Sequence, residues 1–383
     1  MKRQRINDPR TNKLRKNKLV EKIVPGADGL IRDEGKVIFV PGVLPGEEID
    51  FKILEEKKKF SRGICTHIHK SSADRIAAEC PLYGSCGGCN FQHLKYEKQL
   101  EAKTMFLRDM FKKMAGIELA ENLEFTPSKP FAYRQRIQIH SDGQHVGFKA
   151  RRKDSIISVK NCPILLPSLN QYLKSSDPSA FIGRKTLFAT DNTVFEDSDK
   201  REIAIEIEGR QLFFRADLFF QSNALILKDL LDSALQNLQG DNVLDLYCGV
   251  GLFSVFLRDN FSKITAIEIN PEAESFYRKN MEGYDYDYFA MSLEEWLKKG
   301  FYKRTAPVDA IVLDPPRTGL SDSVRTFLSD HPVDNLIYVS CDPATQARDT
   351  KSLLQSGYKI ETVRGFDFYP QTNHMESLVR FIR

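Results

Sequence analysis

The sequence predicts an α/β protein whose C-terminal domain, residues 221–383, is a doubly wound sheet of the Rossmann type. Short apolar runs alternate there with segments of helical periodicity, which is the pattern of that fold. Three of these runs end at residues that can take part in chemistry. They are 243–247, 308–313 and 335–339, followed by the turn Gly249-Val250-Gly251, by Asp314 and by Cys341. Because the carboxyl ends of parallel strands line one crevice, we expect these ends to form a ligand site.

Length and composition bound the rest of the chain. At 383 residues it exceeds one typical core, which predicts two or three domains. Hydrophobic residues make up 41% and charged ones 28%, as in ordinary soluble proteins. No apolar stretch approaches the roughly 18 residues of a membrane span, and the start lacks the features of a signal peptide. We therefore expect a cytoplasmic protein with no membrane partner.

The first segment, residues 1–17, is predicted to be a basic flexible arm. Eight lysines and arginines stand against Asp8 alone within the first eighteen residues, while the whole chain has a net charge of only +4. Such an arm can contact a nucleic-acid backbone, because each neutralised phosphate releases a counterion. A disordered solubilising tail has the same composition and stays open as an alternative.

Residues 18–72 are predicted to form a small OB-like β-barrel. Alternating apolar and polar positions, clearest at 36–40 and 48–53, are separated by glycine and proline turns. A basic stretch, 57–62, follows them. Barrels of this type present such faces to oligonucleotides, so the stretch is a candidate RNA-binding surface. A solvated lysine turn is the alternative.

Residues 73–220 are predicted to be a central β-rich domain. Apolar residues recur at helical spacing between about 94 and 116, so we expect a helix there that packs on the C-terminal domain. Segments 136–140 and 202–207 alternate as strands do.

Three cysteines of this domain share one glycine-rich loop, as Cys80-x5-Cys86-x2-Cys89, and a fourth, Cys162, stands apart. The chain has seven cysteines, an odd and clustered number that does not fit a disulfide framework. Zinc and a 4Fe-4S cluster both accept four thiolates, and spacing alone does not decide between them. The lack of a Cys-x2-Cys pair at both ends favours the iron–sulfur cluster. Thiols without a metal are the alternative.

The glycine turn of the C-terminal domain predicts a nucleotide-like cofactor. Gly249 and Gly251 let a ligand approach the backbone, and the next strand ends at Glu268, an acid placed to hydrogen-bond a ribose diol. Ser254 stands where a dinucleotide motif has its third glycine. The pattern therefore favours S-adenosylmethionine (SAM). Helix capping and surface charge are the alternative roles for Asp245 and Glu268.

Two residues near the C-terminus are candidate general bases. Glu376 directly precedes the apolar strand 377–381, and His374 lies two residues earlier. Either side chain can act if it reaches the proton on the reacting carbon, and the pattern does not choose between them. Cys341 by itself is compatible with an inert buried thiol, but its neighbours at the sheet edge favour a nucleophile beside the cofactor turn.

Four motifs, taken together, resemble the RNA uracil-5-methyltransferases. In chain order they are Asp245-Leu246-Tyr247-Cys248-Gly249-x-Gly251, Asp314-Pro315-Pro316-Arg317-x-Gly319, Ser340-Cys341-Asp342-Pro343 and His374-Met375-Glu376. The cysteine loop, and a front barrel similar to the TRAM domain that ends in Pro41-Gly42-x-Leu44-Pro45-Gly46-Glu47, resemble the subgroup that acts on 23S ribosomal RNA. The resemblance covers residues 18 to 383.

The resemblance implies a covalent mechanism. Cys341 matches the family's nucleophile, which attacks C6 of uracil so that C5 can take the methyl group of SAM, and Glu376 matches the base that removes the C5 proton. The positions that match cofactor contacts are Gln221, Tyr247, Glu268 and Asp314, beside Gly249 and Gly251. The positions that match cluster ligands, with a structural role, are Cys80, Cys86, Cys89 and Cys162.

The resemblance also implies partners. Arg134 and Arg136 match a segment near the target base, where a guanidinium can hold a uracil carbonyl or a phosphate. The expected partner is RNA, 23S rRNA first, bound by a monomer without an obligate protein partner. The family often has asparagine where Leu252 stands, so a polar cofactor contact is missing there.

Three other functions stay open. A tRNA uridine is a possible target. An RNA cytosine-5 methyltransferase resembles a pattern with a second cysteine near the Asp-Pro motif, which Asp314-Pro315-Pro316 lacks. A non-catalytic RNA-binding iron–sulfur protein with a vestigial SAM domain would have to retain Cys341, Asp314 and Glu376 by accident.

Overall fold

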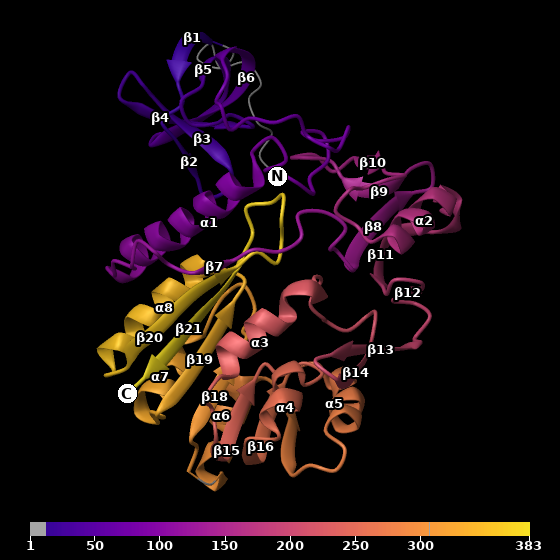
Figure 1. Cartoon of the computed structure of the whole chain (residues 1–383), viewed down its shortest axis with the longest axis vertical. Coiled ribbons are helices and arrows are strands. Elements are labelled where there is room, and N and C mark those ends of the chain that lie inside the picture. Colours follow the sequence, from indigo (N-terminus) through magenta and orange to yellow (C-terminus); the bar gives the residue numbers. More distant parts are fainter. Residues whose placement is uncertain (1–12, 306) are drawn as a thin grey trace. The chain divides into compact units, whose positions relative to one another are not determined.

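The structure is a computed structural model that describes residues 13–305 and 307–383, and the chain forms two compact units (Figure 1). The first contains the described residues up to 106 with 149–155 and 371–373, and the second contains 107–148, 156–370 and 374–383. The expected division into four segments stays a prediction, and residues 107–148 and 156–220 of its central segment fall in the second unit. Residues 1–12 of the expected basic arm lie outside the described residues.

The first unit is built on a six-stranded sheet of order β1-β5-β6-β4-β3-β2. Its strands are β1 (Leu14–Leu19), β2 (Lys22–Val24), β3 (Asp28–Asp33), β4 (Lys36–Pro41), β5 (Glu48–Glu56) and β6 (Phe60–Lys70). β1 starts inside the expected arm. β1 and β2 form the two edges of the sheet, yet only Val20 and Glu21 separate them along the chain. The sheet must therefore curl so that its two edges lie close together.

Alternation of side chains explains the core of this sheet. Ile49, Phe51 and Ile53 of β5 are buried at every second position, as expected for a strand with one face inside. Gly29 is needed where the backbone approaches a neighbour, since a Cβ there would lie 2.5 Å from a methyl carbon of Val43. The strands predicted at 36–40 and 48–53 are found as β4 and β5.

A helix follows the cysteine loop. α1 (Tyr96–Met110) continues into a π-helical turn, η1 (Phe111–Ala115), which ends at Gly116 in the left-handed region at φ 75°. The helix expected from about 94 to 116 is therefore present, starting two residues later. Within the second unit, η1 lies against α8 (Pro343–Gln355) and buries Phe111.

The second unit contains two small sheets besides its main one. A five-stranded sheet has the order β10-β9-β8-β11-β12, and β13 pairs with β14 as a hairpin. The bounds are β8 (Arg136–Asp142), β9 (Val146–Lys149), β10 (Ile156–Ser158), β11 (Ile182–Ala189), β12 (Val194–Glu196), β13 (Glu202–Ile207) and β14 (Arg210–Arg215), with α2 (Pro167–Ser175) beside β12. The strands expected at 136–140 and 202–207 are β8 and β13.

The main sheet has eight strands in the order β17-β16-β15-β18-β19-β21-β20-β7. They are β7 (Phe125–Thr126), β15 (Gly240–Leu246), β16 (Phe261–Glu268), β17 (Tyr286–Ala290), β18 (Ala310–Leu313), β19 (Asn335–Ser340), β20 (Lys359–Phe366) and β21 (Glu376–Ile382). Neighbours are parallel, except that β21 runs against both β19 and β20. The strand order reverses at β15, and α/β sheets bind ligands beyond the carboxyl end of such a strand.

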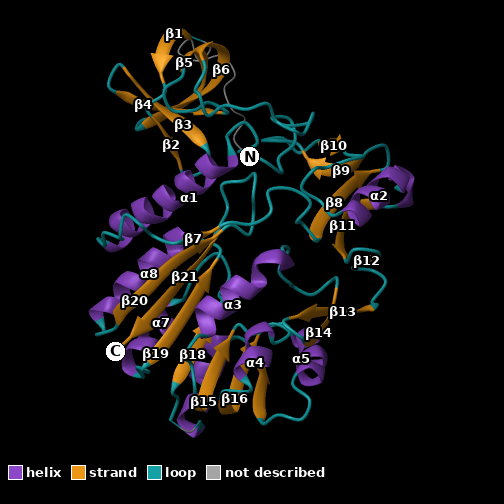
Figure 2. Cartoon of the chain, viewed as in Figure 1, coloured by secondary structure: helices purple, strands orange, loops and turns teal. Residues whose placement is uncertain are grey.

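Helices pack on both faces of this sheet. They are α3 (Leu227–Leu235), α4 (Leu252–Leu257), α5 (Glu274–Asn280), α6 (Leu293–Lys298), α7 (Asp322–Asp330) and α8. In Figure 2, α3 and α4 lie in front of the sheet. α7 packs against both α6 and α8, which are labelled in Figure 1. All four residues of β18 are buried, which is why the sequence shows a continuous apolar run there. The predicted α/β domain is confirmed.

Candidate active site

Four strands bring the predicted catalytic residues to one edge of the main sheet. β15, β18 and β19 are adjacent and parallel, so the residues after their ends, Tyr247, Asp314 and Cys341, lie at the same edge. β21 runs the other way and pairs its Ser377 with Ser340 of β19. Its first residue, Glu376, therefore lies beside Cys341.

A cavity of about 730 Å³ opens at this edge. The predicted site residues that line it are Gln221, Tyr247, Gly249, Glu268, Asp314, Cys341 and Glu376. Gly251 is not among the lining residues. It precedes α4 at φ 92°, and a Cβ there would meet the ring of Tyr277 at 3.0 Å, so this glycine is needed for packing.

The turn after β15 is held by backbone hydrogen bonds to one carboxylate. Glu268, at the end of β16, accepts from the backbone N–H of Gly249 (3.0 Å) and of Asn270 (2.8 Å). Tyr247 adopts a left-handed conformation at φ 64°, which is strained for a residue with a Cβ and is common at ligand sites. The two carboxylate oxygens of Glu268 are thereby fixed at the cavity wall, where they still have lone pairs for a diol.

Asp245 supports the turn from behind. It is buried and accepts from the backbone N–H (3.1 Å) and the hydroxyl (2.5 Å) of Ser254, which in turn accepts from the hydroxyl of Tyr277 (2.9 Å). Burial raises the pKa of Asp245 to about 7. Asp245 thus accepts from the first turn of α4 through Ser254, the serine that stands in place of a third glycine, and the motif did not reveal this structural role.

The Cys341 thiol is held in its neutral form by its surroundings. Burial raises its pKa to about 12, and the nearby carboxyls of Glu376 and Asp314 add to the effect. The positive charge of Arg317, which lines the same cavity, acts against this rise in the pKa. The amino end of α8 does not compensate, since Asp342 accepts from its first N–H groups, those of Ala344 (3.0 Å) and Thr345 (3.1 Å).

Glu376 and Asp314 are unusually basic carboxyls. Burial raises the pKa of Glu376 well above its ordinary value, with a further contribution from Asp314, while the hydrogen bond from Tyr369 (3.3 Å) opposes the shift. Burial also raises the pKa of Asp314 to about 7, with a contribution from Asp245. A carboxylate with a raised pKa is a stronger base than an ordinary one, which suits proton removal from carbon.

The rival base and the two arginines lie outside the cavity lining. His374 is exposed, with its ring centroid 6.2 Å from that of Tyr369. The Arg136 guanidinium lies 5.9 Å from the ring centroid of Phe219, an exposed residue that does line the cavity. Arg134 donates from Nε to the backbone carbonyl of Arg136 (3.1 Å). The sequence alone had assigned no role to Tyr369, Phe219 or Arg317. Of these three, only Arg317 lies in one of the four family motifs.

The four predicted cluster ligands are divided between the two units. Cys80, Cys86 and Cys89 lie between β6 and α1 in the first unit, where the backbone N–H of Gly88 points at the Cys86 sulfur (3.4 Å). Cys162 is buried in the second unit. Within residues 13–305 and 307–383, no three Cys, His, Asp or Glu side chains form a group that could hold a metal ion. The four thiols are donors of the kind that an iron–sulfur cluster or zinc takes.

Among the described residues, none of the helices is long and apolar enough to cross a bilayer.

Comparisons with known proteins agree with this geometry. The family model described as "tRNA (Uracil-5-)-methyltransferase" matches residues 180–383. An "Uncharacterized RNA methyltransferase" of Treponema denticola is 31% identical and covers 90% of this chain and 93% of its own. A Shewanella woodyi protein, "23S rRNA (uracil(1939)-C(5))-methyltransferase RlmD", is 29% identical and covers 92% of each chain.

A solved structure shares the fold across the chain. The Pyrococcus abyssi tRNA (uracil-54, C5)-methyltransferase, in complex with S-adenosyl-L-homocysteine, superposes with a TM-score of 0.73 at 23% identity and covers 95% of this chain and 99% of its own. The matched family region contains the cavity, the glycine turn and both Cys341 and Glu376. The chain therefore belongs to the RNA (uracil-5-)-methyltransferase family and is a SAM-dependent enzyme of that family.

Proposed function

We propose that the protein methylates C5 of a uridine in 23S rRNA through a covalent bond between Cys341 and C6 of the base. The observation that carries this proposal is the pairing of Ser340 with Ser377, which puts a thiol and a basic carboxyl side by side on the wall of one cavity. Uracil C5 is a poor nucleophile, so a methyl transfer to it needs prior attack on C6.

The steps follow from the two side chains. The Cys341 thiolate forms a bond to C6, and the electron pair of the C5–C6 double bond moves into an enolate. Bound SAM would supply the methyl group: as the methyl carbon becomes bonded to C5, its bond to the sulfonium sulfur would break and S-adenosyl-L-homocysteine would leave. Glu376 then takes the proton from C5, the C5–C6 double bond forms again, and the bond from C6 to sulfur breaks to return the thiolate.

Glu376 is the proposed base in preference to His374. Glu376 lines the cavity together with Cys341, whereas His374 is exposed and outside the lining. Its raised pKa increases its strength as a base, and the Tyr369 hydroxyl orients one of its oxygens.

We propose cofactor contacts in the same cavity. Glu268 accepts hydrogen bonds from the ribose diol and Gly249 allows close approach of the backbone, while Tyr247 and Asp314 flank the same space. Gln221 donates from Nε2 to Asp314 (3.5 Å), and its buried carbonyl oxygen has no hydrogen-bond partner in the described residues. That oxygen is available to accept from an ammonium group of the cofactor.

Ribosomal RNA is the proposed substrate because relatives that match nearly the whole chain carry that activity in their names. A tRNA uridine is the second candidate, favoured by the printed activity of the Pyrococcus abyssi enzyme. In either case the uridine must be unstacked before C5 and C6 can reach the cavity, so the target is a loop or a flipped base. We propose that the N-terminal six-stranded sheet is a TRAM-type RNA-binding barrel, with Arg134 and Arg136 closer to the target base.

We also propose a structural 4Fe-4S cluster on Cys80, Cys86, Cys89 and Cys162. Four soft thiolates and a backbone N–H directed at one of the sulfurs support it. No catalytic step depends on it. Protein purified without oxygen should be brown and contain about four irons per chain. Stoichiometric zinc without iron would contradict the proposal.

One experiment tests the function. RNA from a strain lacking the gene is digested and analysed by nucleoside mass spectrometry, with wild type and Cys341→Ala as complementing genes. We expect one 5-methyluridine site in 23S rRNA to be lost and to return only with wild type. Loss of the nucleoside from tRNA instead would establish the second candidate, and unchanged modification in the deletion would contradict both.

A further inference from the structure

Arg317 occupies an unusual place in the cavity wall. It follows β18 in an exposed loop, 316–318, that lines the cavity together with Cys341 and Glu376. Its backbone is held at the start of α8 by the Thr345 hydroxyl, close to Cys341, and its positive charge lowers the pKa of both Cys341 and Glu376. An exposed arginine normally samples many rotamers, so a fixed position near the sulfur needs support from elsewhere.

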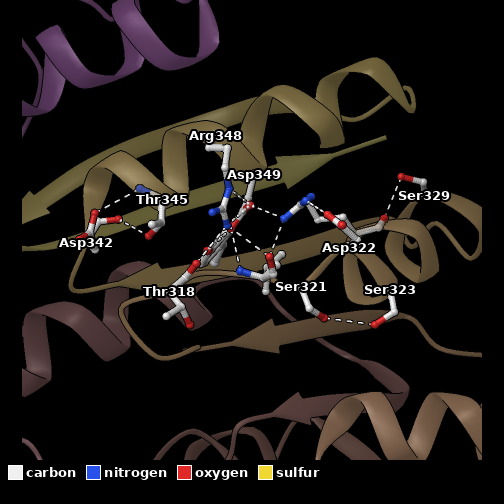
Figure 3. Close-up of polar contacts among 12 residues, drawn as sticks. Thr318, Ser321, Asp322, Ser323, Ser329, Asp342, Thr345, Arg348 and Asp349 are labelled. Atoms are coloured by element: carbon white, nitrogen blue, oxygen red, sulfur yellow. Dashed lines mark hydrogen bonds and ion pairs between the residues drawn. The ribbon is translucent and has the colours of Figure 1, made fainter.

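A buried carboxylate fastens this loop to α8. Asp349 is fully buried on α8 and accepts from the backbone N–H of Leu320 (2.8 Å), from the hydroxyl of Tyr338 (2.9 Å) and from Arg325 (3.1 Å). Figure 3 shows the Arg348 side chain beside Asp349, to which its guanidinium donates a hydrogen bond of 2.8 Å. A buried carboxylate is costly unless its oxygens are hydrogen-bonded. The groups that donate to Asp349 are therefore held in place around it.

The loop backbone itself is held by the same helix. Arg348 donates to the carbonyls of Thr318 (3.1 Å) and Leu320 (3.2 Å), and the Thr345 hydroxyl donates to the carbonyl of Arg317 (3.2 Å). Gly319 packs so closely that a Cβ there would lie 2.6 Å from an Asp349 oxygen, and its φ is +70°. The loop that carries Arg317 thus has one position relative to α8.

The same helix begins directly after the nucleophile. Cys341 precedes Asp342, the residue that caps α8, so α8 connects the thiol at its start to the Asp349 carboxylate two turns later. The loop that carries Arg317 and the residue Cys341 are therefore both attached to the same helix, α8.

We propose that Arg317 is the cation that stabilises the Cys341 thiolate and that Asp349 is the positioning residue that holds Arg317 in place. This inference rests on the proposed role of Cys341 as the nucleophile. The need for a cation follows from the surroundings: Glu376 and Asp314 both disfavour a negative charge on the sulfur, and the N–H groups at the start of α8 are taken by Asp342.

The test measures thiolate formation without RNA and without methyl transfer. The rate of Cys341 alkylation by iodoacetamide at pH 8 is followed by mass spectrometry of its peptide in wild type, Arg317→Gln and Asp349→Asn. Loss of the cation should raise the pKa of the thiol by about one unit. This higher pKa lowers the fraction of Cys341 that is thiolate about tenfold. Each thiolate is also more basic and about threefold more reactive, so the alkylation rate should fall about threefold overall.

Two further variants separate positioning from folding. Gly319→Ala displaces the loop while Asp349 keeps its charge, so it should slow alkylation to a similar extent even if Asp349→Asn does not fold. Asp322→Asn removes an exposed carboxylate that pairs with Arg325 in the same network, and it should react at the wild-type rate. Asp349→Asn and Gly319→Ala keep every atom of Arg317, so a slower rate in them reflects the position of Arg317 and not its loss.

The outcomes are distinct. A wild-type rate in Arg317→Gln would overturn the role of Arg317. Slowing in Arg317→Gln but wild-type rates in folded Asp349→Asn and in Gly319→Ala would overturn the role of Asp349. The double variant of Arg317 and Asp349 should match Arg317→Gln alone, because residues that act through one contact are not additive. A failure of the proposed methylation would show in RNA analysis and leave these alkylation rates unaffected.

Discussion

The buried carboxyl of Asp245 makes folding of this protein dependent on pH in a predictable direction. Its folded pKa of about 7 lies above the ordinary 3.8. A raised folded pKa contributes stability that is fully present below the unfolded pKa and is lost as the pH rises through 7. Replacement by asparagine removes this titration and keeps a carbonyl acceptor for the N–H of Ser254.

The size of the effect follows from the shift. A shift of about three units opposes folding by about 4 kcal/mol at pH 8 and by only about 1.5 kcal/mol at pH 5, where the folded carboxyl is protonated. Asp245→Asn should therefore gain about 2.5 kcal/mol relative to wild type between pH 5 and pH 8. For a unit of this size the gain corresponds to roughly 5–10 °C in Tm.

Thermal unfolding by circular dichroism at the two pH values tests this reasoning. Any constant penalty for the new amide group cancels in the comparison, because it is the same at both pH values. Asp330→Asn, on the exposed surface of α7, is the control, and its Tm should differ from that of wild type by the same amount at pH 5 and pH 8. An equal offset for Asp245→Asn at pH 5 and pH 8 would refute the argument.

Three further predictions concern the cavity. Because the pKa of Asp314 is about 7, binding of the cationic cofactor at pH 7 should release about half a proton. Calorimetry in two buffers of different ionisation enthalpy measures this proton release, and Asp314→Asn should show none. If wild type also releases no proton on cofactor binding, the prediction is wrong. Glu376→Gln should accumulate a methylated RNA adduct, since attack precedes proton removal, and a denaturing gel without that adduct would move the base to another residue. Ser254→Ala leaves Asp245 short of a donor and should lower the free energy of unfolding by about 1–3 kcal/mol, measured by urea titration; an unchanged midpoint would count against this structural role.

Much of the main sheet could be predicted because its strands are buried on both sides. Continuous apolar runs located β15, β18 and β19, and the rule that parallel strands end at one edge placed Asp314 and Cys341 together. Gly249 and Glu268 were located by the order of strand, turn and acid.

The relation between Cys341 and Glu376 could not be predicted in this way. It depends on β21 running opposite to its neighbours and on the register that pairs Ser340 with Ser377. Neither the direction nor the register of a strand is encoded in its own pattern when both of its faces are buried. Residue pattern alone therefore left Glu376 and His374 equally plausible.

Other features depend on tertiary contacts that a linear pattern does not contain. Gly251 belongs to a turn motif, but the ring of Tyr277 fills the space beside it, so the motif did not distinguish a cofactor contact from a packing need. Composition marked the start of the chain as an arm, whereas β1 begins at Leu14, because pairing with β5 outweighs a local excess of charge.

The reversed direction of β21 also determines where the chain leaves the sheet. Ile382 pairs with Asn335, the first residue of β19, at the rim farthest from Cys341. An affinity handle or fluorophore joined after Arg383 would thus emerge on the side remote from the Cys341 thiol. Immobilisation through that point should leave the cavity open to solution, which suits surface-based measurements of RNA capture.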